Sequence, residues 1–227
     1  APEIYHPSKW RAWQDFGTGW SGDIGCHVFD ATWKALDLTA PKTVHATVQE
    51  SWKNSKDRRG DTWPQSDHIT WTFPGNSITE KSELTIEWFD GLFYPPEAAQ
   101  KWYPGKTYPP ESALIVGTEG AVLIPNGGGA MLLPRDKYKG TPQPKLDTRN
   151  HYHHFLDAII GKTKNESYFE QTGPMTEAIL LGTVAIRTPD QKLSWDAANL
   201  AITNHSGAHK LLKRNYRKGW EVSDFNA

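Results

Sequence analysis

The chain lacks three features that would each define a class of protein. Its one cysteine, Cys26, excludes a framework of disulfide bonds. Its uninterrupted apolar runs are short, as from Ala178 to Leu181, whereas a membrane-spanning helix needs about 20 apolar residues. It also has no excess of basic residues, because 25 Lys and Arg balance 26 Asp and Glu for a net charge of −1. The sequence therefore predicts neither a nucleic-acid partner nor a membrane partner.

A start signal is also missing. The 227 residues begin at Ala1 with neither a methionine nor a basic and then apolar leader. We therefore expect a fragment or a processed product. Any export signal would lie upstream of Ala1, so the sequence favours neither a cytoplasmic nor a periplasmic location.

Aromatic residues are plentiful. Eleven Trp, eight Tyr and eight Phe favour either flat apolar ligands such as sugar rings or a strongly aromatic core. A chain of this length can bury a sizeable core without covalent cross-links.

The first half of the chain has the periodicity of one helix followed by a sheet. Spacings of three and four predict a helix over residues 21–37, with an apolar stripe of Ile24, Val28, Ala31 and Ala35. Three strands with alternating apolar residues follow, at 44–48, 69–73 and 84–88. Residues 114–116 and 122–124 flank a glycine turn and predict a hairpin. The proline-rich segment 91–111 is expected to hold no regular element.

The second half is mostly helical. Tyr152, Phe155, Leu156 and Ile159 make an apolar stripe that Gly161 ends, and a second helix is expected to start at Pro174. A short strand pair (193–195 and 200–203) and a helix at 208–212 complete the chain. The sequence thus predicts one α+β domain over 1–227, with an open, mostly antiparallel sheet and helices packed on one face.

A glycine pattern precedes the first helix. Residues 17–22 satisfy G-x-G-x-x-G, but the dinucleotide-binding motif also requires a buried strand immediately upstream. Residues 10–16 contain no aliphatic run. We interpret the glycines as a tight turn into a helix and expect no cofactor-binding residues in this chain.

The polar side of the first helix carries candidate catalytic residues. Asp23, His27, Asp30 and Lys34 fall on one stripe. Asp23 in the first turn could orient His27 four residues later, and an imidazole oriented by a carboxylate can move a proton at neutral pH. Helix capping and ordinary surface pairing account for the same spacing, so the pattern alone leaves both interpretations open.

Other groups of potential metal-binding or catalytic residues are weaker indicators of a site. His151, His153 and His154 cluster at a helix start, where a polar helix end is a commoner explanation than a metal. Asp23, His27 and Asp30 have no fourth ligand at diagnostic spacing, so no metal site is predicted. No G-x-S-x-G motif occurs, and Cys26 has no basic neighbour to activate it.

The chain resembles the C-terminal domain of the Gfo/Idh/MocA oxidoreductases, most closely the bacterial branch of sugar dehydrogenases. The similarity rests on WRAWQDFGTGWSGDIGCHVFD at 10–30, HFLDAI at 154–159, EAILLG at 177–182, WD at 195–196 and YRKGW at 216–220. It covers essentially the whole chain, and the D-x-x-x-H-x-x-D pattern at Asp23, His27 and Asp30 is its most specific part.

The resemblance implies the substrate-binding half of an NAD(P)-dependent oxidoreductase acting on a sugar or cyclitol hydroxyl. Asp23 and His27 correspond to the family's catalytic pair, with His27 taking the hydroxyl proton while hydride leaves the same carbon. The N-terminal Rossmann domain, which would bind NAD or NADP and supply a catalytic Lys in a Glu-Lys-Pro context, is absent from this chain. The isolated chain is therefore expected to be inactive.

The resemblance also implies a partner and a pocket. The open sheet face, with Thr70, Thr72 and Glu87, corresponds to the family's subunit interface, so a homo-oligomer is expected. Arg11 and Trp13, before the glycine turn, and Asn150 and His151, at the later helix start, are candidates for the substrate-pocket wall.

Two alternatives remain open at this stage. The same family includes enzymes that cleave glycosides by oxidation and re-reduction, which release an aglycone without net NADH. A non-catalytic carbohydrate-binding or assembly domain would instead keep the fold without the chemistry.

Overall fold

The computed structural model describes residues 5–104, 107–142, 144–146 and 148–220. Along these residues the elements are η1 (Pro7–Ala12), α1 (Gly19–Ala35), β1 (Thr43–Val48), α2 (Glu50–Lys53), α3 (Lys56–Asp61), β2 (Asp67–Pro74), β3 (Glu83–Phe89), α4 (Glu97–Gln100), β4 (Ser112–Val116), β5 (Ala121–Pro125), β6 (Met131–Leu133), α5 (His151–Ile159), α6 (Phe169–Arg187), β7 (Leu193–Asp196), β8 (Ala201–Ile202), α7 (Ser206–His209) and η2 (Lys210–Leu212).

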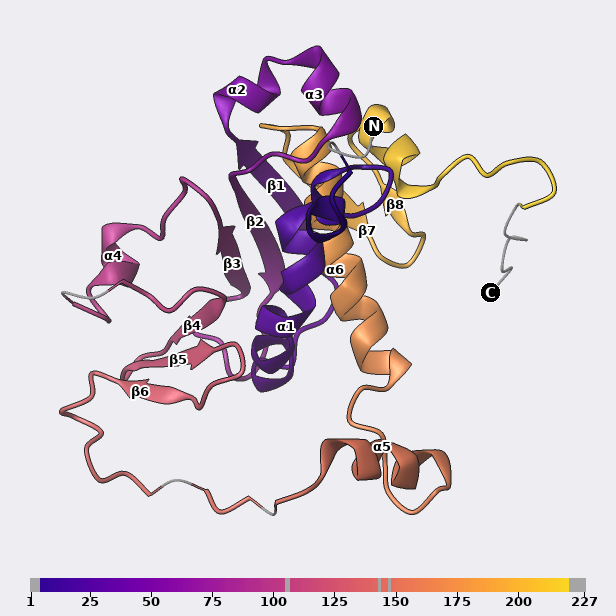
Figure 1. The fold of residues 1–227 in the computed structure, drawn as a ribbon. Helices are drawn as coiled ribbons and strands as arrows, with labels where there is room; N and C mark the ends of the chain where they lie inside the picture. Colours follow the sequence, from indigo (N-terminus) through magenta and orange to yellow (C-terminus); the bar gives the residue numbers. More distant parts are fainter. Residues whose placement is uncertain (1–4, 105–106, 143, 147, 221–227) are drawn as a thin grey trace.

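An open antiparallel sheet forms the main layer. Its strand order is β3-β2-β1-β7-β8, and α1 and α6 lie over the same face of it (Figure 1). Burial alternates along β1 and β2, as the alternating sequence of these strands predicts. The predicted α+β class, with an open sheet and helices on one face, is confirmed.

A second, smaller sheet is formed by the predicted hairpin. Strands β4, β5 and β6 pair in that order, and the Gly117 N–H donates to the Gly120 carbonyl at 2.8 Å to close the turn. Leu123 and Leu133 are buried in a core of this sheet's own.

The main core lies between the sheet and α6. Trp71 of β2 is buried beneath the helix, and its indole N–H donates to the Ala178 carbonyl at 2.8 Å. The hydrogen bond requires close approach, and Gly182 allows it because a Cβ there would lie 2.7 Å from Trp71 Cζ2. Four of the eleven tryptophans are buried in this core, namely Trp33, Trp52, Trp63 and Trp71. These four tryptophans therefore serve packing, whereas others, such as Trp10 and Trp20, are exposed.

Helix α1 buries a different stripe from the predicted one. The expected apolar stripe of Ile24, Val28, Ala31 and Ala35 is at most half-buried. The buried side instead holds Gly25, which lies against Ile179 of α6, and Trp33, which packs edge-on against Phe73 at 6.0 Å. Close contact between two helices favours small residues such as glycine. A prediction based on the spacing of hydrophobic residues does not detect such positions.

Helix α6 starts earlier than predicted. It begins at Phe169, so Pro174 lies inside it rather than in its first turn. The proline ring normally clashes with the N–H and with the Cβ of the residue before it. Gly173 has no Cβ, so the second of these clashes is absent. The Thr172 hydroxyl donates to the Tyr168 carbonyl at 3.1 Å within the same region. These two local features allow α6 to continue past Pro174.

Two short helices occur in the opening stretch and in the segment 91–111, which was predicted to hold no regular element. The opening stretch holds η1, whose first residue is Pro7, and the proline-rich segment 91–111 holds the single turn of α4. Pro96 is the residue immediately before α4, so this proline does not interrupt the helical turn.

Candidate functional site

The polar stripe of α1 is present on the helix as predicted, with Asp23 and Asp30 half-buried and His27 and Lys34 exposed. At the N-terminal end of the stripe, Arg11 Nε lies 2.5 Å from Asp23 Oδ2, an ion pair without an aligned N–H···O hydrogen bond. The 3₁₀ turn of η1 carries Arg11 to this position. The predicted wall residue Arg11 and the predicted catalytic residue Asp23 are therefore neighbours.

Two indole rings flank this ion pair. The Arg11 guanidinium carbon lies 5.6 Å from the centre of the Trp10 ring and 5.1 Å from that of Trp20. Both tryptophans are partly exposed. Aromatic faces hold a guanidinium in place and also stack on sugar rings.

His27 does not contact Asp23. No hydrogen bond or ion pair joins the His27 side chain to any residue that the structure describes, and Asp23 pairs with Arg11 instead. The expectation that Asp23 orients His27 directly is not met in this structure. The two side chains still project from successive turns of one helix.

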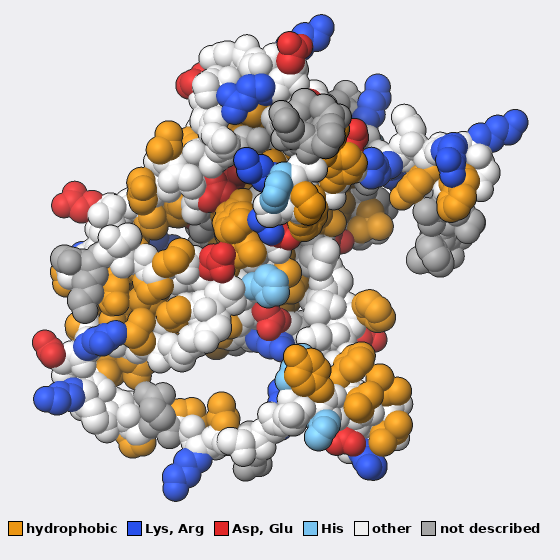
Figure 2. Space-filling view, in the orientation of Figure 1, with side chains coloured by type: hydrophobic (Ala, Val, Ile, Leu, Met, Phe, Trp, Pro, Cys, Tyr) orange, Lys and Arg blue, Asp and Glu red, His pale blue; other side chains and the backbone are white. Residues whose placement is uncertain are grey.

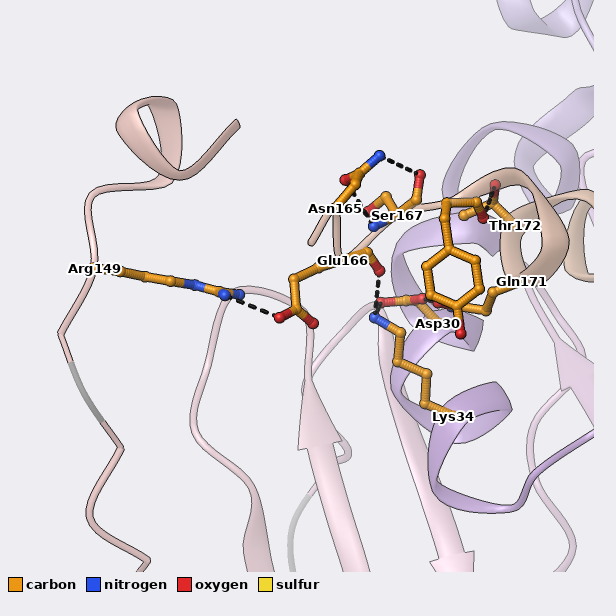
Figure 3. Close-up of polar contacts among 9 residues, drawn as sticks. Asp30, Lys34, Arg149, Asn165, Glu166, Ser167, Gln171 and Thr172 are labelled. Carbon is orange, nitrogen blue, oxygen red and sulfur yellow. Dashed lines mark hydrogen bonds and ion pairs between the residues drawn. The ribbon is translucent and has the colours of Figure 1, made fainter. Parts of the chain in front are cut away.

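The C-terminal half of the stripe contacts the first turn of α6 and the segment before it. Gln171 Nε2 donates to Asp30 Oδ1 at 2.8 Å, and Lys34 Nζ donates to the Glu166 carbonyl at 3.1 Å (Figure 3). Arg149 Nη1 pairs with Glu166 Oε1 at 3.1 Å, and this hydrogen bond lowers the pKa of Glu166. Sequence spacing could not reveal these partners, because Asp30 and Gln171 are 141 positions apart.

The remaining predicted wall residues have structural contacts. Trp13 forms a backbone bridge with Thr62 after α3, and its ring lies 4.9 Å from that of Tyr5. The Asn150 side chain accepts from the His153 N–H at 3.0 Å and so caps α5, while His151 is exposed in the first turn. Among the described residues, no hydrogen bond, ion pair or ring contact joins Asn150 or His151 to Asp23 or His27.

The surface around Asp23 and His27 is open. Two hollows of about 640 and about 370 Å³ occur elsewhere, the first beside α3 and the second beside the N-terminal part of α6. Neither is lined by Asp23 or His27. In the part of the chain described, no helix is long and apolar enough to cross a membrane, and no three His, Cys, Asp or Glu side chains gather as metal ligands would.

The glycines at 17–22 do not fit a dinucleotide. The 3₁₀ turn η1, rather than a strand, precedes them, and α1 begins at Gly19. A Cβ at Gly17 would lie 2.7 Å from Arg11 Cα, and one at Gly19 would lie 3.2 Å from Trp63 Cγ. The space beside the glycines is therefore filled by the protein itself. Gly17 and Gly19 form the predicted turn into the helix, whereas Gly22 lies within α1.

No family model and no curated protein matches this chain.

Proposed function

We propose that this chain is the substrate-binding half, with the catalytic histidine, of an NAD(P)-dependent oxidoreductase acting on a sugar or cyclitol hydroxyl. The observation that carries the proposal is the pair Asp23 and His27, one turn apart on the open side of α1, with Arg11 holding the carboxylate. The partly exposed rings of Trp10 and Trp20 beside them suit a sugar face.

The chemistry of these residues is proton transfer and orientation. His27 accepts the proton of the substrate hydroxyl, and its exposure leaves the imidazole accessible to that hydroxyl. Asp23 Oδ1 has no partner among the described residues and can accept a hydrogen bond from a neighbouring hydroxyl. The proposal assigns NAD or NADP to a second domain, as the resemblance implies, and Gly17 and Gly19 support it because they pack against Arg11 and Trp63 of the protein itself.

A turnover experiment tests the proposal in the longest polypeptide that the gene encodes. Reduced nicotinamide is followed while NAD⁺ or NADP⁺ is supplied with a panel of sugars and cyclitols. His27→Ala is expected to lower kcat by at least about 100-fold, as loss of a general base does. The control His153→Ala removes an exposed imidazole from α5, and full activity is expected. Full activity of His27→Ala would overturn the proposal.

Two further outcomes point to other functions. Release of an aglycone without net NADH would indicate the glycoside-cleaving reaction of the same family. Tight sugar binding by this chain alone, unchanged in Asp23→Asn and His27→Ala, would indicate a non-catalytic carbohydrate-binding domain. Fluorescence of Trp10 and Trp20 reports that binding, because both rings flank the Arg11–Asp23 pair.

We further propose that the open sheet face joins copies of this chain. The cross-strand neighbours Thr70 and Glu87 lie on the face opposite α1 and α6, and His68 Nε2 lies 2.9 Å from Glu87 Oε1 beside them. Thr70→Arg places a charge at the centre of this face and is expected to lower the molar mass measured by light scattering. Thr141→Arg, exposed outside the sheet, is the control. An equal mass for both variants would contradict this interface.

A further inference from the structure

A basic hollow lies at the opposite end of α6 from α5, and neither Asp23 nor His27 lines it. It has a volume of about 640 Å³ and is formed by the α2–α3 connection, the last turn of α6 and η2. Its lining residues are Lys53, Asn54, Lys56, Arg59, Gly60, Arg187 and Leu211. Four of the seven are cations and none is an acid.

At the edge of the hollow, the positive charge of Lys53 is balanced by two carboxylates. Its ammonium lies 2.5 Å from Asp190 Oδ2 and 3.2 Å from Glu50 Oε1, and the hydrogen bond to Asp190 raises the pKa of Lys53. Asn54 donates to the other oxygen of Glu50 at 3.1 Å. The carboxylates of Asp190 and Glu50 are therefore paired with Lys53 and Asn54.

The other three cations have no carboxylate partner among the described residues. The Arg59 guanidinium lies over the Trp52 ring and donates to the Arg187 carbonyl at 3.4 Å, while Lys56 has no ion pair. Arg187 is half-buried, and burial alone lowers the pKa of its guanidinium. A cation removed from water without a counter-ion costs free energy, which a bound anion would offset.

From this geometry we propose that the hollow binds a small oxyanion with more than one negative charge. Two guanidinium groups present the paired N–H donors that match phosphate and carboxylate oxygens, and Lys56 adds a point charge. The volume suits a small molecule. The overall charge of −1 does not favour an extended polyanion such as nucleic acid.

Binding is measured by isothermal titration calorimetry with pyrophosphate and with citrate, each at an ionic strength matched with sodium chloride. Arg187→Gln is expected to weaken binding about ten-fold, since a hydrogen bond to a charged group contributes about 1.5 kcal/mol. Lys56→Gln, at an exposed position, is expected to weaken it about three-fold. Lys139→Gln removes an exposed lysine elsewhere and is the matched control. Preference for pyrophosphate or for citrate identifies the phosphate or the carboxylate source.

The position of Arg187 in the last turn of α6 has a competing explanation, because a cation there interacts favourably with the helix dipole. If that were its role, Arg187→Gln would lower the melting temperature without anion and leave affinity unchanged. The proposal expects the reverse, an unlowered melting temperature and weaker binding. Absence of binding beyond the chloride control, or an equal effect of Lys56→Gln and Lys139→Gln, would also overturn it.

Discussion

The main sheet and the α5 arm (residues 148–168) carry similar side chains in opposite surroundings. Ile69 and Phe73 of β2 are fully buried, Ile69 beneath α6 and Phe73 against α1, whereas Phe155 and Ile159 of α5 are 55% and 65% exposed. No residue of α5 is buried, and its apolar side chains gather at the end of the molecule where α5 stands apart from the sheet (Figures 1 and 2). Burial, and not composition, makes one region the core.

The largest expected difference comes from the same substitution in both regions. Ile69→Ala should lower the free energy of unfolding by about 3 kcal/mol, since it leaves a cavity in a closely packed core. Ile159→Ala should change it by less than about 0.5 kcal/mol, because that side chain is already in water. Urea denaturation followed by tryptophan fluorescence measures both. Equal losses would mean that α5 is packed in solution.

The two glycines of α6 extend the comparison within one helix. Gly182→Ala should destabilise the protein by about 2 kcal/mol, because the new Cβ would lie 2.7 Å from Trp71 Cζ2. Gly173→Ala meets no such contact, and the gain in helix propensity of about 1 kcal/mol is opposed by the clash with Pro174. A net change within about 0.5 kcal/mol is expected. Thermal unfolding of both variants measures the difference, and a destabilising Gly173→Ala of equal size would contradict it.

The carboxyl groups of the two regions should respond to pH in opposite directions. Burial raises the pKa of Asp67 well above 3.8, and the neighbouring Asp90 raises it further, while Arg149 lowers the pKa of the exposed Glu166. The contribution of Asp67 to stability is therefore full below pH 3.8 and is lost as the pH rises through its folded-state value. That of Glu166 is present at neutral pH and is lost as the pH falls.

Asp67→Asn removes the buried charge and should stabilise the protein at neutral pH by about 1 kcal/mol, the low end of the cost of an unpaired buried polar atom. It should also flatten the fall in stability as the pH rises above about 4. Glu166→Gln, in the exposed arm, should leave the global curve unchanged. Urea titrations across this range provide the measurement. An unchanged pH slope in Asp67→Asn would show that another group dominates.

The sequence could predict features that local spacing sets, but not those that tertiary packing sets. The strands β1 and β2 were predictable because alternation reports which side of a strand is buried, and Asp23 and His27 because helical spacing sets their relative position. Arg11 was predicted near the pocket through the resemblance, but its ion pair with Asp23 depends on the course of η1. The partners Gln171 and Glu166 could not be predicted, since only tertiary packing brings them to α1.

The smallest effect on global stability is expected from the cap of α5. Asn150 accepts from the His153 N–H, so Asn150→Ala should cost the helix about 1 kcal/mol, equivalent to about a five-fold loss of amide protection in the first turn. Global unfolding should not change, because α5 buries no side chain against the core. Ser55→Ala is the matched control, since Ser55 caps α3 in the same way next to the buried Trp52. Hydrogen exchange of α5, read together with urea denaturation, measures both. A global loss in Asn150→Ala equal to that in Ser55→Ala would show that α5 unfolds together with the sheet, and the two regions would then form one cooperative unit.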